Sequence, residues 1–283
     1  MAWFHRPDPG RAEAAALRRK LARLDELRKQ QKGETKRLAQ TAEIQDREIA
    51  ALEQVVGRLL AERGALPLPP PELRENVGRN VGLGNFLSQG LGSARRVLEV
   101  FGYDPGGPVL DWGCGSGRTL TWLRGAGSWN RNYRGCDVDE AAIAWLRRNG
   151  VAGVEVCADL PPLPYPDAAF RGLFAFSVLT HIPPPDHAAW HAEIARVLKP
   201  GARAYLTVHS DASMGATRSL SDEERGRYAA QGWCWSERPG HYKHAALVRR
   251  DFTLAALPPT LELERYEPAG YHTMDALVVR KAP

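Results

Sequence analysis

The stretch that decides the fold is Val109–Gly117, which reads VLDWGCGSG. An apolar run ends in Asp111, glycines follow at positions 113, 115 and 117, and a helical pattern begins at Arg118. Glycine adopts positive φ and lets main-chain N–H groups approach a ligand that a side chain would block. The spacing is not the G-x-G-x-x-G of dinucleotide sites, because Arg118 stands where the third glycine belongs. The acid before the loop favours a ligand that carries an ammonium group over a pyrophosphate.

Apolar, strand-like runs alternate with helical patterns on both sides of this stretch. The predicted strands are Pro108–Trp112, Tyr133–Asp137, Val154–Cys157, Phe170–Ser177 and Ala202–Val208, and the predicted helices are Arg118–Arg124, Glu140–Asn149 and His187–Leu198. This alternation is typical of a parallel sheet covered by helices. Two later segments, Thr260–Tyr266 and Met274–Arg280, predict an antiparallel pair at a sheet edge. We therefore expect an α/β fold with a doubly wound, mostly parallel seven-stranded sheet and an antiparallel edge strand.

Two further acids stand at the ends of the next predicted strands. Asp137 follows Gly117 by 20 residues, where a carboxylate can accept both hydroxyls of a ribose. Asp159 follows the third strand and suits the amino group of an adenine. One acid at a strand end is more often a helix cap or a loop residue. Three acids at successive strand ends behind a glycine loop indicate a nucleoside-binding site.

The chain resembles the class I S-adenosylmethionine-dependent methyltransferases over about residues 84–283. The segments that carry the resemblance are VLDWGCGSG, GCDVD, ADLPPLPYPDAAF, FSVLTHI and EIARVLKPGARAYLTV. The resemblance implies a Rossmann-like fold, S-adenosylmethionine as cofactor and S-adenosylhomocysteine as product. It places Asp111 near the amino-acid end of the cofactor, Asp137 at the ribose and Ser177 at the end of the fourth strand, where it closes the pocket. The other implied cofactor residues are Gly113, Gly115, Gly117, Val138, Asp159 and Leu160.

The acceptor is expected to be a hydroxyl oxygen of a sugar, a glycan intermediate or another small metabolite. A narrower resemblance to bacterial glycan methyltransferases rests on Phe86, Leu87 and Gly90, on TVHSD and on MDALVVRK. An alcohol must lose a proton, and the candidate bases are His181 and His209, each just beyond a predicted strand. Either histidine is alternatively a wall residue of the pocket.

Other readings of the acceptor side stay open. Between the fifth strand and the edge pair lie His241, Tyr242 and His244, where a lid or an acceptor pocket could be built but where we expect a surface loop. Trp233 and Trp235 could stack against a sugar face, but we expect them to pack in the core. The tetrad Ser177–Thr180 lacks the Asn/Asp-Pro-Pro-aromatic sequence of enzymes that methylate nucleobase amino groups. The alternatives are an RNA or protein methyltransferase and an adaptor that binds the cofactor without turnover.

The N-terminal part has a different pattern. Leu17, Leu21, Leu24, Leu38, Ala42, Ile49, Leu52, Val56 and Leu59 share one 3-4 heptad register, which predicts a coiled coil. Three interpretations remain: a helix that pairs with a second chain, a hairpin that turns at Gly33, and a single helix that lies on its own domain. The predicted organisation is a coiled-coil segment at 1–66, a proline-rich linker at 67–72 and a methyltransferase domain at 73–283.

Composition narrows the classes of function. The chain has 283 residues and a net charge of +5, most of it before residue 67, so nucleic acid is an improbable partner. The four cysteines form no C-x-x-C pair, and we expect neither a metal site nor disulfides. The chain shows no leader pattern and no run of 18 apolar residues. We therefore expect a cytoplasmic protein without a membrane span, which forms a homodimer through its coiled coil.

Overall fold

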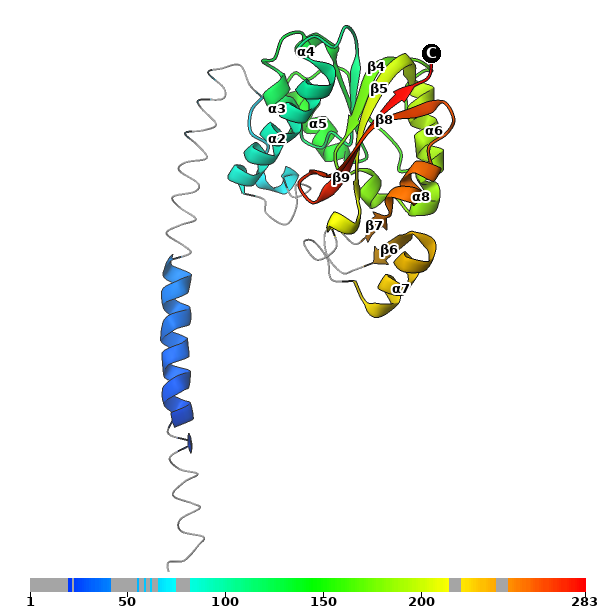
Figure 1. Cartoon of the computed structure of the whole chain (residues 1–283). Coiled ribbons are helices and arrows are strands. Elements are labelled where there is room, and N and C mark those ends of the chain that lie inside the picture. The colour runs from blue at the N-terminus through cyan, green and yellow to red at the C-terminus, as the bar shows by residue number, and fades with distance from the viewer. Residues whose placement is uncertain are drawn as a thin grey trace, which may run out of the picture. The chain divides into compact units, whose positions relative to one another are not determined.

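The computed structural model describes residues 20–21, 23–41, 55, 59, 62, 66–74, 82–213, 220–237 and 244–283. The chain divides into two compact units, Met1–Leu59 and Leu60–Pro283. In the first unit, residues 23–41 form one helix that continues through Gly33, so the hairpin that turns at this glycine does not form (Figure 1). Leu21, Leu24 and Leu38 belong to the heptad register and are 62%, 63% and 63% exposed. The other register positions, apart from Leu59, lie outside the described residues.

The second unit is built on one sheet whose path is β3-β2-β1-β4-β5-β7-β6, with β9 paired to β5 and β8 paired to β9. The strands are β1 Val109–Trp112, β2 Tyr133–Asp137, β3 Val154–Val156, β4 Phe170–Ala175, β5 Leu198–His209, β6 Trp233–Glu237, β7 His244–Val248, β8 Leu261–Tyr271 and β9 Met274–Lys281. Strands β1 to β5 are mutually parallel, and β9 runs antiparallel to β5 and to β8. The predicted parallel sheet with an antiparallel edge pair is confirmed.

The sheet is larger than the seven strands expected. The stretch between the fifth strand and the edge pair, for which we predicted no strand, contains the antiparallel hairpin of β6 and β7, which joins the sheet where His209 of β5 pairs with Leu247. The apolar runs WCWSE and HAALV are only five residues each, too short to distinguish a strand from a buried loop.

Helices cover both faces of the sheet, as a doubly wound fold requires (Figure 1). The helical elements are η1 Pro71–Leu73, α2 Leu83–Phe101, α3 Leu120–Leu123, α4 Trp129–Asn132, α5 Glu140–Arg148, η2 Leu179–His181, η3 Pro184–Asp186, α6 His187–Val197, η4 Asp211–Ser213, α7 Asp222–Gln231 and α8 Arg250–Ala255. One core cluster holds Val97 of α2, Leu123 of α3 and Leu146 of α5. The other holds Trp190 and Ile194 of α6, against which Phe252 of α8 packs.

The segment before α2 is attached to this unit. Leu66 is 1% exposed and belongs to the same core cluster as α2 and α3. The Ser116 hydroxyl donates to the carbonyl of Leu73 over 2.8 Å. The expected linker, 67–72, is therefore held close to the glycine loop at both of its ends, by Leu66 and by Leu73. In the part of the chain that the structure describes, no helix has the length and apolar character needed to cross a membrane.

Candidate functional site

The glycine loop connects the end of β1 to α3, and its three glycines all have positive φ, at +80°, +49° and +82°. A Cβ on Gly113 would lie 2.3 Å from Val178 Cγ2, and one on Gly117 would lie 2.8 Å from Leu146 Cδ2. These two glycines are required by packing within the protein. A Cβ on Gly115 would instead meet only Asp137 Oδ2, at 4.0 Å. The backbone at Gly115 therefore borders open space, as it must where a ligand approaches.

Asp137 ends β2 and is oriented by the main chain. The amide of Gly115 donates to Oδ2 over 2.6 Å, and the amide of Asp139 donates to Oδ1 over 2.9 Å. Burial raises the pKa of Asp137, and these hydrogen bonds oppose the rise. The amide of Val138 also donates to this carboxylate. A carboxylate has about four acceptor sites, so Asp137 keeps one for a further donor beside the glycine loop. A ribose hydroxyl fits this acceptor.

Apolar side chains are exposed at the ends of two neighbouring strands. Val138 follows β2 and is 57% exposed, and Leu160, just beyond β3, is 59% exposed. Asp159 is also exposed and stands next to Leu160. Strands β2 and β3 are adjacent and parallel, so these residues share the carboxyl edge of the sheet. Two exposed aliphatic side chains beside a carboxylate suit a flat heteroaromatic ring with an amino substituent.

Asp111 lies within β1 and is 3% exposed. The Tyr133 hydroxyl donates to its Oδ2 over 2.9 Å, whereas its Oδ1 makes no hydrogen bond within the described part of the chain. Burial raises the pKa of Asp111 to about 7, against the hydrogen bond from Tyr133 and the positive charge of Arg118. A buried carboxyl with an unused acceptor favours a cationic hydrogen-bond donor.

Ser177 follows β4 and has φ +61°, a conformation that costs a non-glycine residue about 1–3 kcal/mol. Its amide donates to Thr207 Oγ1 over 2.7 Å. The Thr180 hydroxyl donates to the Ser177 carbonyl, so the Ser177 hydroxyl donates to Thr180 Oγ1, over 2.7 Å. These contacts hold a left-handed residue directly before Val178, whose side chain touches the glycine loop.

The structure places the two candidate bases on contacting elements. His209 ends β5, and its Nδ1 lies 3.0 Å from Ser213 Oγ, which itself donates to the carbonyl of Thr273. Because the single hydroxyl proton of Ser213 is used there, His209 Nδ1–H donates to Ser213 and the lone pair of the neutral ring is on Nε2. His181 is exposed on η2, with Nδ1 3.4 Å from the carbonyl of His244. Element η2 contacts both β5 and β7.

The β6–β7 hairpin adds aromatic residues at this edge. Trp235 stacks on His244 with ring centroids 5.2 Å apart and an interplanar angle of 8°. Trp233 instead packs against Phe252 and the core, as expected. His241 and Tyr242 lie outside the described residues.

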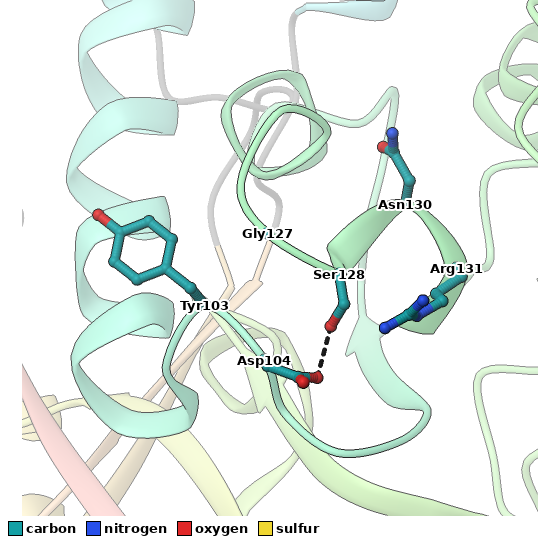
Figure 2. A pocket seen from close by; sticks show the side chains of 6 residues that line it. All are labelled: Tyr103, Asp104, Gly127, Ser128, Asn130 and Arg131. Carbon is teal, nitrogen blue, oxygen red and sulfur yellow. Dashed lines mark hydrogen bonds between the residues drawn. The ribbon is translucent and has the colours of Figure 1, made fainter.

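A hollow of about 490 Å³ lies elsewhere, as Figure 2 shows. Its lining residues are Tyr103, Asp104, Gly127, Ser128, Asn130 and Arg131. They precede β1 and β2 in the chain, so the hollow lies at the amino edge of the sheet, whereas ligands of open α/β folds bind at the carboxyl edge. The candidate site is therefore the carboxyl edge. Among the described residues no group of three histidines, cysteines or acids is placed to hold a metal ion there.

Sequence reasoning missed several residues of this edge. Tyr133 and Thr207 orient Asp111 and Ser177, but both lie within strand patterns that predicted only packing. Arg118 was expected only to open a helix, but its positive charge lowers the pKa of Asp111. The position after a glycine loop is the one signal that would have found it.

Comparison with known proteins shows what the central part of the chain is similar to. Residues 109–201 match the family model described as a methyltransferase domain. An O-methyltransferase of Pyrenophora dematioidea is 34% identical over 122 residues, which are 40% of this chain and 44% of that protein. A cycloartenol-C-24-methyltransferase of Arabidopsis thaliana is 36% identical over 106 residues, 35% of this chain and 30% of that protein. This chain thus spans less than half the length of these relatives.

Solved structures of similar fold include an S-adenosylmethionine-dependent methyltransferase of Aquifex aeolicus. That structure has a TM-score of 0.47 at 18% identity, and the match covers 76% of this chain and all of that one. A second, from Methanosarcina mazei, has a TM-score of 0.48 at 20% identity and covers 62% of this chain and 92% of that one.

Proposed function

We propose that this chain, whose residues 109–201 match a methyltransferase domain, is a class I, S-adenosylmethionine-dependent enzyme that methylates a hydroxyl oxygen of a sugar, a glycan intermediate or another small metabolite. The observation that carries the proposal is the open backbone at Gly115, hydrogen-bonded to an Asp137 carboxylate that can accept a further hydrogen bond.

The residues present fit the donor. Asp137 would hold the ribose hydroxyls, Val138, Asp159 and Leu160 the adenine, and Asp111 the ammonium of the amino-acid end. The loop of Gly113, Gly115 and Gly117 would border the donor, and Ser177 would close its pocket beside Val178. When bound, S-adenosylmethionine supplies an electrophilic sulfonium methyl group. The protein then contributes mainly the alignment of the acceptor oxygen with that methyl group and the electrostatics around it.

His209 is the better supported of the two candidate bases. In the tautomer that donates from Nδ1 to Ser213, Nε2 is the basic ring nitrogen, and it would take the proton of an acceptor hydroxyl. His181 lies on an exposed turn, and its Nδ1 contact with the His244 carbonyl is long at 3.4 Å. We assign His209 as the base and His181 as a wall residue of the acceptor pocket.

The acceptor class rests on the hairpin and on one relative. The stacked pair of Trp235 and His244 presents aromatic surface of the kind that packs against sugar rings. The relative from Pyrenophora dematioidea is named an O-methyltransferase, while the one from Arabidopsis thaliana methylates carbon according to its name. The hairpin lies beyond residue 201, where the family match ends, so it is a part in which the acceptor can differ between relatives.

Thermal unfolding with each candidate cofactor tests the donor assignment. At about 100 times Kd, a ligand adds about 2.7 kcal/mol to the folded state. We expect S-adenosylmethionine and S-adenosylhomocysteine to raise the midpoint by several degrees and NAD to leave it unchanged. A shift with NAD alone would contradict the donor assignment. Binding without consumption of S-adenosylmethionine over a panel of hydroxylated acceptors would favour an adaptor.

A substitution tests the base. With an acceptor in hand, His209→Gln is expected to lower kcat by about 10²- to 10⁴-fold and to leave S-adenosylhomocysteine affinity unchanged. His181→Gln is the matched control and should change KM more than kcat. The reverse pattern would move the base to His181.

We further propose that the heptad face of the N-terminal helix pairs with a second copy of the chain, and that the enzyme works in the cytoplasm. Leu21, Leu24 and Leu38 are exposed on this helix, which a partner helix would cover. The four cysteines are all buried and unbridged, as suits a reducing compartment.

A further inference from the structure

The hollow at the amino edge of the sheet has no part in the proposed function. Its volume of about 490 Å³ is within the range of small-molecule sites. It lies between the segment that follows α2 and the segment that leads into α4 (Figure 2). The glycine loop and His209 are at the opposite, carboxyl edge. A ligand in this hollow would therefore occupy a second site.

Contacts between the two segments fix the shape of the hollow. The Ser128 amide donates to the Tyr103 carbonyl over 3.0 Å, and the indole of Trp129 donates to the Gly102 carbonyl over 3.0 Å. A Cβ on Gly127, which has φ +53°, would lie 2.2 Å from the same Tyr103 carbonyl oxygen. Glycine is thus required where the two segments meet. The walls of the hollow are set before any ligand binds.

Asp104 is an oriented carboxylate in this hollow. Its Oδ1 accepts from the Ser128 hydroxyl over 2.6 Å and from the Gly106 amide over 3.2 Å. These hydrogen bonds lower the pKa of Asp104, and the positive charge of Arg131 lowers it further, so the group is ionised at neutral pH. Within the described part of the chain its Oδ2 accepts no hydrogen bond. This oxygen can accept from a ligand hydroxyl.

Donors and an aromatic surface border the same hollow. The side chains of Asn130 and Arg131 are exposed, and among the described residues neither makes a hydrogen bond or an ion pair. Tyr103 is 65% exposed, more than any other large apolar side chain that the structure describes. Figure 2 shows Tyr103 on one side of Asp104 and Arg131 on the other. The hollow thus combines an acceptor, two donors and a ring.

We propose that this hollow binds a neutral carbohydrate. Sugar hydroxyls donate to Asp104 and accept from Asn130 and Arg131, since a hydroxyl does both. The C–H face of a sugar ring packs on Tyr103, as apolar surface does on an aromatic side chain. An anion would be repelled by the carboxylate, and a cation by the guanidinium. The polar groups and the ring therefore fit an uncharged ligand with many hydroxyls.

This inference goes beyond the proposed function, because it needs neither the donor nor a reacting hydroxyl. The hollow and the donor site are at opposite edges of the sheet, so a sugar bound here is not the one that reacts. The site would hold a distant part of a glycan chain, or a separate glycan, and would act in binding alone.

Chemical-shift mapping by NMR on the isotope-labelled full chain tests this site. The neutral probes are trisaccharides of glucose, galactose, mannose and N-acetylglucosamine, and the charged probes are inorganic phosphate and spermidine. The amides of Gly127 and Ser128 report on the hollow, and those of Gly115 and Asp137 report on the carboxyl edge. S-adenosylhomocysteine affinity is measured separately by calorimetry on the same proteins.

We expect at least one trisaccharide to shift the amides of the hollow, and neither charged probe to do so. Tyr103→Ala should weaken that binding by about tenfold, because it removes the ring contact, and Arg131→Gln by a similar factor. The ring of Tyr103 is exposed and only its carbonyl holds Ser128, so Tyr103→Ala should keep the fold. The control Arg148→Gln, which changes an exposed arginine on α5, should match the unmodified chain.

No shift at the hollow with any trisaccharide would overturn the proposal, and so would equal affinity of Tyr103→Ala and the unmodified chain. A larger shift with phosphate or spermidine than with every trisaccharide would replace it with an ion site. A trisaccharide that shifts only the amides of the carboxyl edge would belong to the acceptor pocket and would also overturn it. None of these results changes the S-adenosylhomocysteine measurement, so failure of this site and failure of the proposed function are distinguishable.

Discussion

At the scale of single residues, Gly115 has a backbone conformation that alanine tolerates poorly and a position that faces open space. Gly150 is its match after α5, with φ +74° and nothing within 4 Å of an added Cβ. Alanine at either position should cost about 1–2 kcal/mol of folding stability. Only Gly115→Ala should also weaken S-adenosylhomocysteine, measured by calorimetry. Equal S-adenosylhomocysteine affinity of Gly115→Ala and Gly150→Ala would show that the glycine loop is not part of the donor site.

We expect Asp111 to lower folding stability and to strengthen donor binding. Its pKa rises from 3.8 to about 7 on folding, so holding it ionised at pH 8 costs about 4 kcal/mol. Because the folded pKa is the higher one, this carboxyl stabilises the fold below pH 4 and that stabilisation is lost as the pH rises through 7. Asp111→Asn still accepts from Tyr133 and should raise the thermal midpoint at pH 8 while weakening the donor. A lower thermal midpoint of Asp111→Asn at pH 8 would show that other groups in the fold stabilise the buried charge of Asp111.

At the scale of elements, α6 is tied to its surroundings by two buried histidines. His187 Nε2–H donates to the carbonyls of Leu179 and Ile182, each at 3.1 Å, and so fixes η2, which carries His181. His191 Nδ1–H donates to the carbonyl of Ala256 at the end of α8. Burial disfavours the charged form of both rings: it lowers the pKa of His187, and it lowers the pKa of His191 to about 4.

Low pH should therefore weaken the packing of α6. An unfolded histidine takes up a proton near pH 6.5, so folding stability from His191 is complete above that pH and falls by about 3 kcal/mol towards pH 4. Protonation of Asp111 raises folding stability as the pH falls over the same range, so the test compares His191→Gln with the unmodified chain. The thermal midpoint of His191→Gln should change less between pH 7 and pH 4.5 than that of the unmodified chain. Parallel curves for the two proteins would contradict the assignment.

The strands of the sheet also show which features of the fold the sequence can predict. Strands β1, β2 and β4, with the acids Asp111 and Asp137 that the first two carry, follow from apolar runs of four to eight residues next to glycine or acid, a local pattern. The β6–β7 hairpin depends on a single pairing with the end of β5, which no local pattern encodes. Likewise the tautomer of His209 depends on Ser213 and on Thr273, 60 residues further along the chain. The donor-side prediction rests on such local patterns at successive strand ends, whereas the acceptor side depends on contacts between segments far apart in the chain.

At the scale of the whole molecule, the heptad face predicts self-association. Leu24 and Leu38 occupy core positions of the register, and each is 63% exposed in the single chain. Leu24→Lys with Leu38→Lys should convert a dimer to a monomer in light scattering, without changing S-adenosylhomocysteine affinity. Lys29→Glu, off the heptad core, is the control. A monomeric unmodified chain would leave the helix unpaired.

The burial of Leu66 determines where the chain can be truncated. It is buried against the back of the glycine loop, 3.4 Å from the place a Cβ of Gly117 would take, although it precedes the prolines that we expected to form a linker. A minimal fragment for crystallisation should therefore begin near Leu60, where the second compact unit starts, and not at residue 73. A fragment that begins at 73 leaves a leucine-sized gap beneath the loop, which costs about 2–5 kcal/mol and would distort the proposed donor site in the truncated protein.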